Sequence, residues 1–292
     1  MIAQKDWDYQ AERQESMLVA ALSVIPQTSC VEIECGNPFQ NLILRKVWEE
    51  YALEAYRIVR SRPSQCVRVL SAALQAGLPI QHFEQDQMMS SCFEDDYLAR
   101  NVNRWEELGG LKSLRLVIID LNGVFFASHA AAERLHHVLS SFPILEHLSV
   151  HLQTLDAGPI SFLPVTETGT LRSLSLSSVS IKPVGFKAFL ERHLSTLKRL
   201  HLRFVDIPQG HGSWRDFLEI LRDQFKDKLD KFQLDGMVAS IDGDNERWQL
   251  WPRYDEKWNV LEKERSPRTR EIEDFVLGRG SWPMVPTDSM TS

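Results

Sequence analysis

The chain has 292 residues, of which 43% are hydrophobic and 25% charged, and its formal net charge is -7. It is long enough to bury a substantial core as one or two domains. Its mild acidity argues against broad nucleic-acid binding, which needs a clustered basic surface. The apolar segment Met17–Ile25 is about half as long as a bilayer span. The N-terminus lacks the basic start and following apolar segment of a signal peptide, so none is expected.

Cysteine usage predicts an intracellular protein, cytoplasmic or nuclear. None of the cysteines forms a Cys-x-x-Cys pair, and a zinc site would need closer, paired ligands. We therefore expect four reduced thiols, at Cys30, Cys35, Cys66 and Cys92.

The N-terminal third is predicted to hold degenerate units of helix and strand. Apolar side chains recur at helical spacing in some segments and alternate in others. Helices are expected over residues 10–25, 44–58 and 64–77, and strands over residues 28–33 and 80–85. Gly77 lies at the predicted end of the third helix. The acidic segment 85–108 is expected to form a long loop with a short helix.

A leucine phrase recurs through the rest of the chain. Leu-x-x-Leu-x-Leu, or a close variant, begins at Leu111, Leu145, Leu171, Leu197 and Leu229, so successive copies lie 34, 26, 26 and 32 residues apart. A strand and a helix repeating every 20 to 29 residues or so are typical of leucine-rich repeats. We therefore predict an α/β leucine-rich-repeat solenoid, a curved parallel sheet with helices on its convex side.

Amphipathic helices are predicted between these strands, over residues 128–142, 185–197 and 213–225. In each segment, apolar side chains recur at spacings of three and four residues. Ser213 and Asp216 have the layout of a capping box at the start of the last helix. Each helix is long enough to return the chain to the start of the next parallel strand.

The repeat pattern ends near residue 240, and four of the eight tryptophans follow, at positions 248, 251, 258 and 282. The last unit of a solenoid has no neighbour to cover its apolar edge, so we expect a cap there. The predicted organisation is an irregular repeat arc over 1–240, a tryptophan-rich cap over 241–286 and a disordered tail over 287–292. Within the arc, degenerate repeats span 10–108 and clearer repeats span 109–240.

Alternation along a strand places the leucines in the core and the intervening side chains on the concave face. The predicted partner-binding residues are Arg115, His147, His151, Arg199, His201, Arg203 and Lys231. The same rule places Val117, Ser177 and Asp235 on this face, with acidic residues such as Glu84 and Asp86 toward its N-terminal end. Arg199 and Arg203 flank His201 and form a candidate hot spot, because arginine is enriched at hot spots. The plain alternative is a row of solvated strand positions.

Other polar groupings predict no metal, cofactor or catalytic centre. His147 and His151 lie roughly 13 Å apart on one strand, too far to share an ion. The sequence leaves open whether His136 or His137 approaches either of them, and surface histidines are the favoured interpretation. Residues 241–246 lack the glycine position and distal glutamate of a calcium loop, so a hairpin turn is expected. No glycine-rich phosphate loop or Gly-x-Ser-x-Gly elbow is present.

The repeats, together with Leu78-Pro79-Ile80 and the segments Trp248–Trp258 and Ile272–Gly278, resemble fungal F-box or leucine-rich-repeat-like proteins over most of residues 10–286. In that family an F-box module docks a Skp-type adaptor of a cullin ubiquitin ligase, and the repeats hold the substrate. No Leu-Pro opening of an F-box precedes the first repeat. The resemblance therefore assigns no adaptor-binding residue and implies a Skp-type adaptor only if an F-box exists elsewhere.

These observations predict a non-enzymatic protein-protein interaction module with a protein partner, and neither nucleic acid nor membrane. Its specific version is the substrate-recognition part of an F-box-type ubiquitin ligase receptor that lacks its F-box. The alternative is a compact α/β enzyme or a small-ligand-binding domain, because alternating strands and helices also suit a doubly wound sheet. Such an enzyme is expected to carry a glycine-rich turn after a strand.

Overall fold

The computed structural model describes residues 16–23, 30–33, 72–89, 108–119, 129–153, 158–159, 163, 169–240, 247–250 and 267–283. The chain divides into two compact units. The N-terminal unit comprises Met1–Leu155 with Ser161–Thr166, and the C-terminal unit comprises Asp156–Ile160 with Glu167–Ser292. Outside the described residues lie the helix predicted over 44–58, residues 90–107 of the loop predicted over 85–108, the tail 287–292 and three of the four cysteines. Residues 85–89 belong to a strand, His82–Met89, so the loop prediction is wrong for them.

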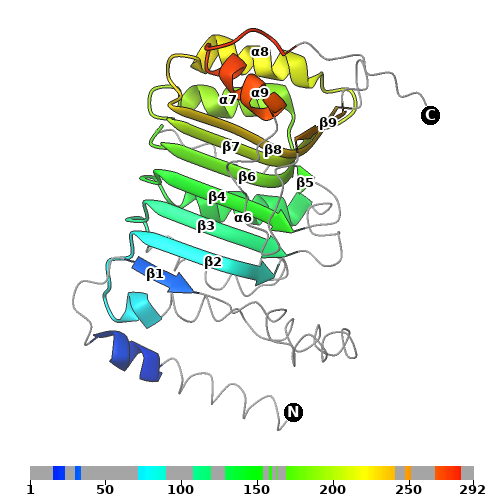
Figure 1. Cartoon of the computed structure of the whole chain (residues 1–292). Coiled ribbons are helices and arrows are strands. Elements are labelled where there is room, and N and C mark those ends of the chain that lie inside the picture. Colours follow the sequence, from blue (N-terminus) through cyan, green and yellow to red (C-terminus); the bar gives the residue numbers. More distant parts are fainter. Residues whose placement is uncertain are drawn as a thin grey trace, which may run out of the picture. The chain divides into compact units, whose positions relative to one another are not determined.

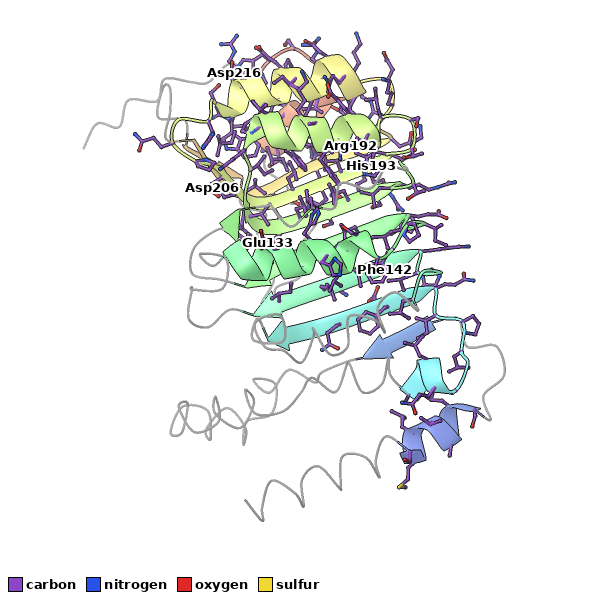
Figure 2. The ribbon with its side chains drawn as sticks, turned by 180° about the vertical axis from the view of Figure 1, so that it is seen from behind. Glu133, Phe142, Arg192, His193, Asp206 and Asp216 are labelled. Carbon is purple, nitrogen blue, oxygen red and sulfur yellow. The ribbon has the colours of Figure 1, made fainter. Side chains whose placement is uncertain are left out.

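The N-terminal unit contains four parallel strands in chain order. They are β1 (Cys30–Ile33), β2 (His82–Met89), β3 (Ser113–Ile119) and β4 (His147–Gln153). Helix α6 (His129–Ser140) connects β3 to β4 and lies over one face of these strands, as Figures 1 and 2 show from opposite sides. Residues 16–23 and 72–75 are also helical, within the helices predicted there.

The leucine phrase sets the register of β3 and β4. Leu114 is paired with Leu148 and Leu116 with Val150, and all four side chains are at most 3% exposed. Phe83 of β2 is paired with Leu114 and is also buried, so apolar side chains meet across all three strands. The predicted helix end at Gly77 is confirmed: this residue has a φ of 71° and its N–H donates to the Leu74 carbonyl at 2.9 Å.

The C-terminal unit has a parallel core of three strands in chain order, β6 (Ser173–Ser180), β7 (Arg199–Ile207) and β8 (Lys231–Ser240). The short β5 (Gly158–Pro159) pairs with β6, and β9 (Arg247–Leu250) runs antiparallel to β8. Its helices are α7 (Pro183–Arg192), α8 (Trp214–Phe225) and α9 (Pro267–Val276). The protein therefore has an α/β fold with parallel strands in each unit, as the sequence predicts.

Helices α7 and α8 form the apolar layer behind these strands (Figures 1 and 2). Helix α8 begins as its capping box predicts, because the Ser213 hydroxyl accepts a hydrogen bond from the Asp216 N–H at 3.1 Å. Helix α7 begins two residues before its predicted start, where Pro183 supplies a favourable φ for the first turn. The Phe186 and Phe217 rings join the two helices, with their centroids 5.9 Å apart.

Helix α9 packs against α8 and β8, in the segment predicted to act as a cap. Its Ile272, Phe275 and Val276 side chains are at most 2% exposed. The Trp282 ring meets the Phe275 ring edge-on at 5.0 Å, so one of the four predicted cap tryptophans packs on this helix. The side chains of the other three lie outside the described residues.

The strands β6, β7 and β8 share a backbone feature at their sixth residue. Ser178, Phe204 and Gly236 have φ values of 57°, 50° and 87°, in the left-handed region. In β6 and β7 this residue shifts the alternation, so that the next buried apolar side chains after Leu176 and Leu202 are Val179 and Val205. The spacing Leu-x-Leu-x-x-Val-x-Ile records this shift twice in the sequence.

Candidate functional site

The candidate site is the open face of each unit, which we define as the face of the strands opposite to the helices α6, α7 and α8. In the N-terminal unit it contains three of the predicted binding residues, Arg115 on β3 and His147 and His151 on β4. Arg115 is exposed, whereas the two histidines are half-buried. The Arg115 guanidinium pairs with the Glu84 carboxylate at 3.3 Å across β2 and β3, so the acidic end of the predicted gradient is partly neutralised.

The C-terminal unit brings together the other four predicted residues, Arg199, His201 and Arg203 on β7 and Lys231 on β8. We call these four residues the basic cluster. Arg199 and Lys231 are exposed, while His201 and Arg203 are half-buried. Their neighbours Leu200, Leu202 and Phe232 are at most 1% exposed, so the two sets of side chains lie on opposite faces.

Three of the side chains that the alternation rule places on the open face are buried and not solvated. Val117, Ser177 and Asp235 are between 3% and 7% exposed. In β6 and β8 these residues immediately precede the left-handed residues Ser178 and Gly236, where the regular alternation of side chains stops. A strict two-residue period therefore does not extend beyond these positions.

His201 is held between two neighbouring strands. Its Nε2 lies 2.9 Å from Oδ2 of Asp235 on β8, and its Nδ1 lies 3.4 Å from Oγ of Ser175 on β6. Because an ionised carboxylate only accepts hydrogen bonds, Nε2–H donates to Asp235, which leaves Nδ1 of a neutral ring to accept from the Ser175 hydroxyl. This arrangement orients the imidazole within the basic cluster.

The order serine, histidine, aspartate also occurs in nucleophilic triads, but there the carboxylate contacts Nδ1 and the serine contacts Nε2. The ring nitrogens are exchanged in this protein, and the distance from serine to imidazole is longer than a usual O–H···N bond. The sequence analysis placed His201 and Asp235 on one face but missed this chain of bonds. Alignment of the repeats could have indicated this contact, because it places Asp235 on the strand next to His201, two residues beyond Gln233, the register partner of His201.

Arg203 and Phe204 form a second feature of the basic cluster. The Arg203 guanidinium lies 5.0 Å from the centroid of the Phe204 ring, a cation–π geometry. On β8, Gly236 leaves room for that ring: a Cβ atom built on it would lie 2.6 Å from Cδ1 of Phe204. The aromatic ring thus occupies the space that any other residue at position 236 would fill.

Arg199 and Lys231 differ from the other cations of the open faces. They are direct partners in the register of β7 and β8, so two positive charges face the same side of neighbouring strands. Within the described ranges, no hydrogen bond or ion pair engages either side-chain cation. By contrast, Arg115 is paired with Glu84 and Arg203 is stacked on Phe204.

Two groups of the C-terminal unit, the buried His193 and the half-buried Asp206, have displaced pKa values. Desolvation, with a smaller contribution from the Arg192 charge, lowers the pKa of His193 to about 4. The ring lies at the end of α7 (Figure 2), is 3% exposed and packs 4.9 Å from the Phe189 ring. Desolvation also raises the pKa of Asp206 to about 6, against the opposing effect of its backbone and Ser180 hydrogen bonds. Neither group belongs to the basic cluster.

These displacements predict opposing responses to acid. The folded state resists protonation of His193, so its contribution to stability is lost as the pH falls from 6.5 toward 4, by about 3 kcal/mol at most. Asp206 acts with the opposite sign, because its raised pKa favours the folded state as the pH falls from 6 toward 3.8. Urea unfolding followed by tryptophan fluorescence between pH 7 and pH 4 measures the sum.

Two variants separate the contributions. His193→Gln is expected to remove the loss of stability toward pH 4, whereas Asp206→Asn should make that loss steeper, because the compensating carboxyl is gone. An unchanged pH profile in His193→Gln would contradict the assignment of the acid-sensitive group.

The described residues offer no alternative site built on a metal or a membrane. Among them, no group of three or more His, Cys, Asp or Glu side chains could hold a metal ion. His136, one of the histidines considered for such a site, lies with its Nδ1 3.0 Å from the Leu163 carbonyl oxygen. None of the helices in the described ranges is both long and apolar enough to cross a bilayer.

Comparison with protein-family models, with curated proteins and with solved structures found no match to this chain.

Proposed function

We propose that this protein is a non-enzymatic protein-interaction module that holds its partner on the open face of its strands. The observation that carries the proposal is the exposed pair Arg199 and Lys231, which lies in register on β7 and β8 opposite the helices. Both side chains are exposed, so neither contributes to the packing of the core. An arginine and a lysine presented together by a rigid sheet are suited to contacts with another protein.

A leucine-rich-repeat architecture is part of this proposal. At four strand starts, one carbonyl accepts hydrogen bonds from two consecutive N–H groups at the start of the following strand. The four accepting residues are Gln81, Lys112, Arg172 and Lys198. For example, the Arg172 carbonyl accepts from Lys198 at 2.8 Å and from Arg199 at 3.0 Å. Recurrence of one backbone arrangement at these starts supports a repeated structural unit, in which the open face is the usual binding surface.

The proposal is tested with a photo-crosslinking amino acid placed at single positions of the full chain in cell extract. We expect a discrete crosslinked protein with the probe at Ser173, on the open face. Arg199→Glu in that protein should abolish the crosslink while leaving cooperative thermal unfolding intact, because this side chain is exposed.

The matched control places the probe at Glu191, an exposed residue of α7 on the helical side. The same crosslinked protein from both positions, or no effect of Arg199→Glu, would contradict binding on the open face. Unfolding of Arg199→Glu would show instead that the side chain faces the core.

The ubiquitin-ligase receptor is the narrower form of the proposal and rests on the resemblance of the repeats. It predicts that the crosslinked protein is ubiquitinated more slowly when Arg199→Glu replaces the wild-type chain. It also predicts co-precipitation of a Skp-type adaptor, either directly or through a second chain. Loss of crosslinking without change in ubiquitination would leave the interaction module and remove the ligase role.

A further inference from the structure

We propose that Arg199 and Lys231 form a carboxylate-binding site that recognises an acidic segment of a protein partner. This inference rests on the proposed interaction function and names the chemistry of the partner. The two residues are register partners on adjacent parallel strands, which lie about 4.8 Å apart. A single carboxylate between them can accept hydrogen bonds from the guanidinium and the ammonium at once.

The arrangement is unfavourable without such a ligand. Like charges directly opposite each other on neighbouring strands repel, and elsewhere on the open faces the structure places opposite charges together, as in Glu84 with Arg115. On the same face, the Asp235 carboxylate is engaged by His201 at 2.9 Å. Among the described residues, no acidic side chain pairs with Arg199 or Lys231.

The surroundings favour a peptide carboxylate. The whole chain carries a net charge of -7, which disfavours an anionic partner over the molecule at large, whereas the positive charges of this pair attract one locally. The sequence neighbours Leu200 and Phe232 are buried, which fixes the strands beneath the pair. Ser173, the residue in register on β6, adds a hydroxyl that can donate to the same ligand.

The experiment measures binding of a fluorescein-labelled oligoglutamate peptide to the full chain by fluorescence anisotropy at low ionic strength. We expect Arg199→Glu and Lys231→Glu each to weaken binding by about tenfold, the loss expected for one charge-assisted hydrogen bond. The matched control is Arg270→Glu, which changes the net charge equally at an exposed cation of α9. It should weaken binding by less than about twofold, because the remaining effect is long-range and screened.

A charge-swapped protein gives a gain of function that damage to the fold could not produce. The double variant Arg199→Glu with Lys231→Glu is expected to bind oligolysine more tightly than the wild-type chain does, and oligoglutamine should bind neither protein. All variants are first compared by thermal unfolding, and those of the pair should retain the wild-type transition.

Several results would overturn the site. The first is no binding of oligoglutamate, and the second is an equal loss of affinity in Arg270→Glu. The third is a single-stranded oligonucleotide that binds more tightly than oligoglutamate and whose binding is lost in Arg199→Glu and Lys231→Glu. The last result would assign the pair to phosphates of a nucleic acid. If oligoglutamate fails while the crosslink from Ser173 still depends on Arg199, the interaction function stands and only the carboxylate chemistry is wrong.

Discussion

Replacing Leu174 by aspartate is expected to unfold the C-terminal unit. The side chain is fully buried in β6 and is paired in register with Leu200 of β7, which is itself 1% exposed. Removing it costs the transfer and cavity terms of a core leucine, about 2 to 5 kcal/mol, and the carboxyl group must in addition be desolvated without a partner. The sum approaches the whole stability of an ordinary domain, about 5 to 15 kcal/mol.

The measurement is the loss of a cooperative thermal transition in circular dichroism. Two controls isolate the cause. Leu174→Met keeps the volume and polarity of the core and should cost less than about 1.5 kcal/mol. Ser173→Asp adds the same charge one residue earlier, on the open face, and should leave the transition in place. A cooperative wild-type transition in Leu174→Asp would place this strand face outside the core.

Replacing Gly236 by alanine is expected to destabilise the C-terminal unit by about 2 to 4 kcal/mol. Two costs combine. The residue has a φ of 87°, where a side chain is strained, and the new Cβ would lie within 3.0 Å of three atoms of the Phe204 ring. The ring must therefore move away from the position in which Arg203 stacks on it.

Gly210→Ala provides the matched control for the backbone cost. Gly210 has a similar φ of 80°, yet nothing lies within 4 Å of its added Cβ. It should cost about 1 kcal/mol in urea unfolding, so the excess in Gly236→Ala measures the clash with Phe204. The double variant Phe204→Ala with Gly236→Ala should be more stable than the sum of its single variants implies. Strict additivity would show that the ring is not the obstacle.

The periodic leucines made β3, β4, β6, β7 and β8 predictable. Leu114, Leu148, Leu174 and Leu200 each mark a buried position, and the pairing of their strands follows from aligning the phrase. The boundaries of α8 were also predictable, because Ser213 and Asp216 supply a local capping signal at its start. The end of α7 was less so. Apolar residues continue at helical spacing to Leu197, but the helix ends at Arg192 and turns follow.

The details of the candidate site were harder to predict because they depend on the geometry between strands. The sequence placed Arg199, His201, Arg203 and Lys231 on one face, yet it did not distinguish the free cations from the occupied ones. That distinction arises from contacts across strands, such as Asp235 with His201, between residues 34 positions apart. The shift in alternation after Leu176 occurs at the left-handed Ser178, and at this position the residue type gives no strong indication of that conformation.

The paired N–H groups at the strand starts have a consequence for how this molecule could be altered. Lys198 and Arg199 are tied to Arg172 through main-chain atoms, and so are Asp230 and Lys231 to Lys198. The identity of the outward side chains is therefore not what joins one strand to the next. Combinatorial libraries that randomise positions 173, 199 and 231 should yield mostly folded proteins, from which variants with new specificities can be selected.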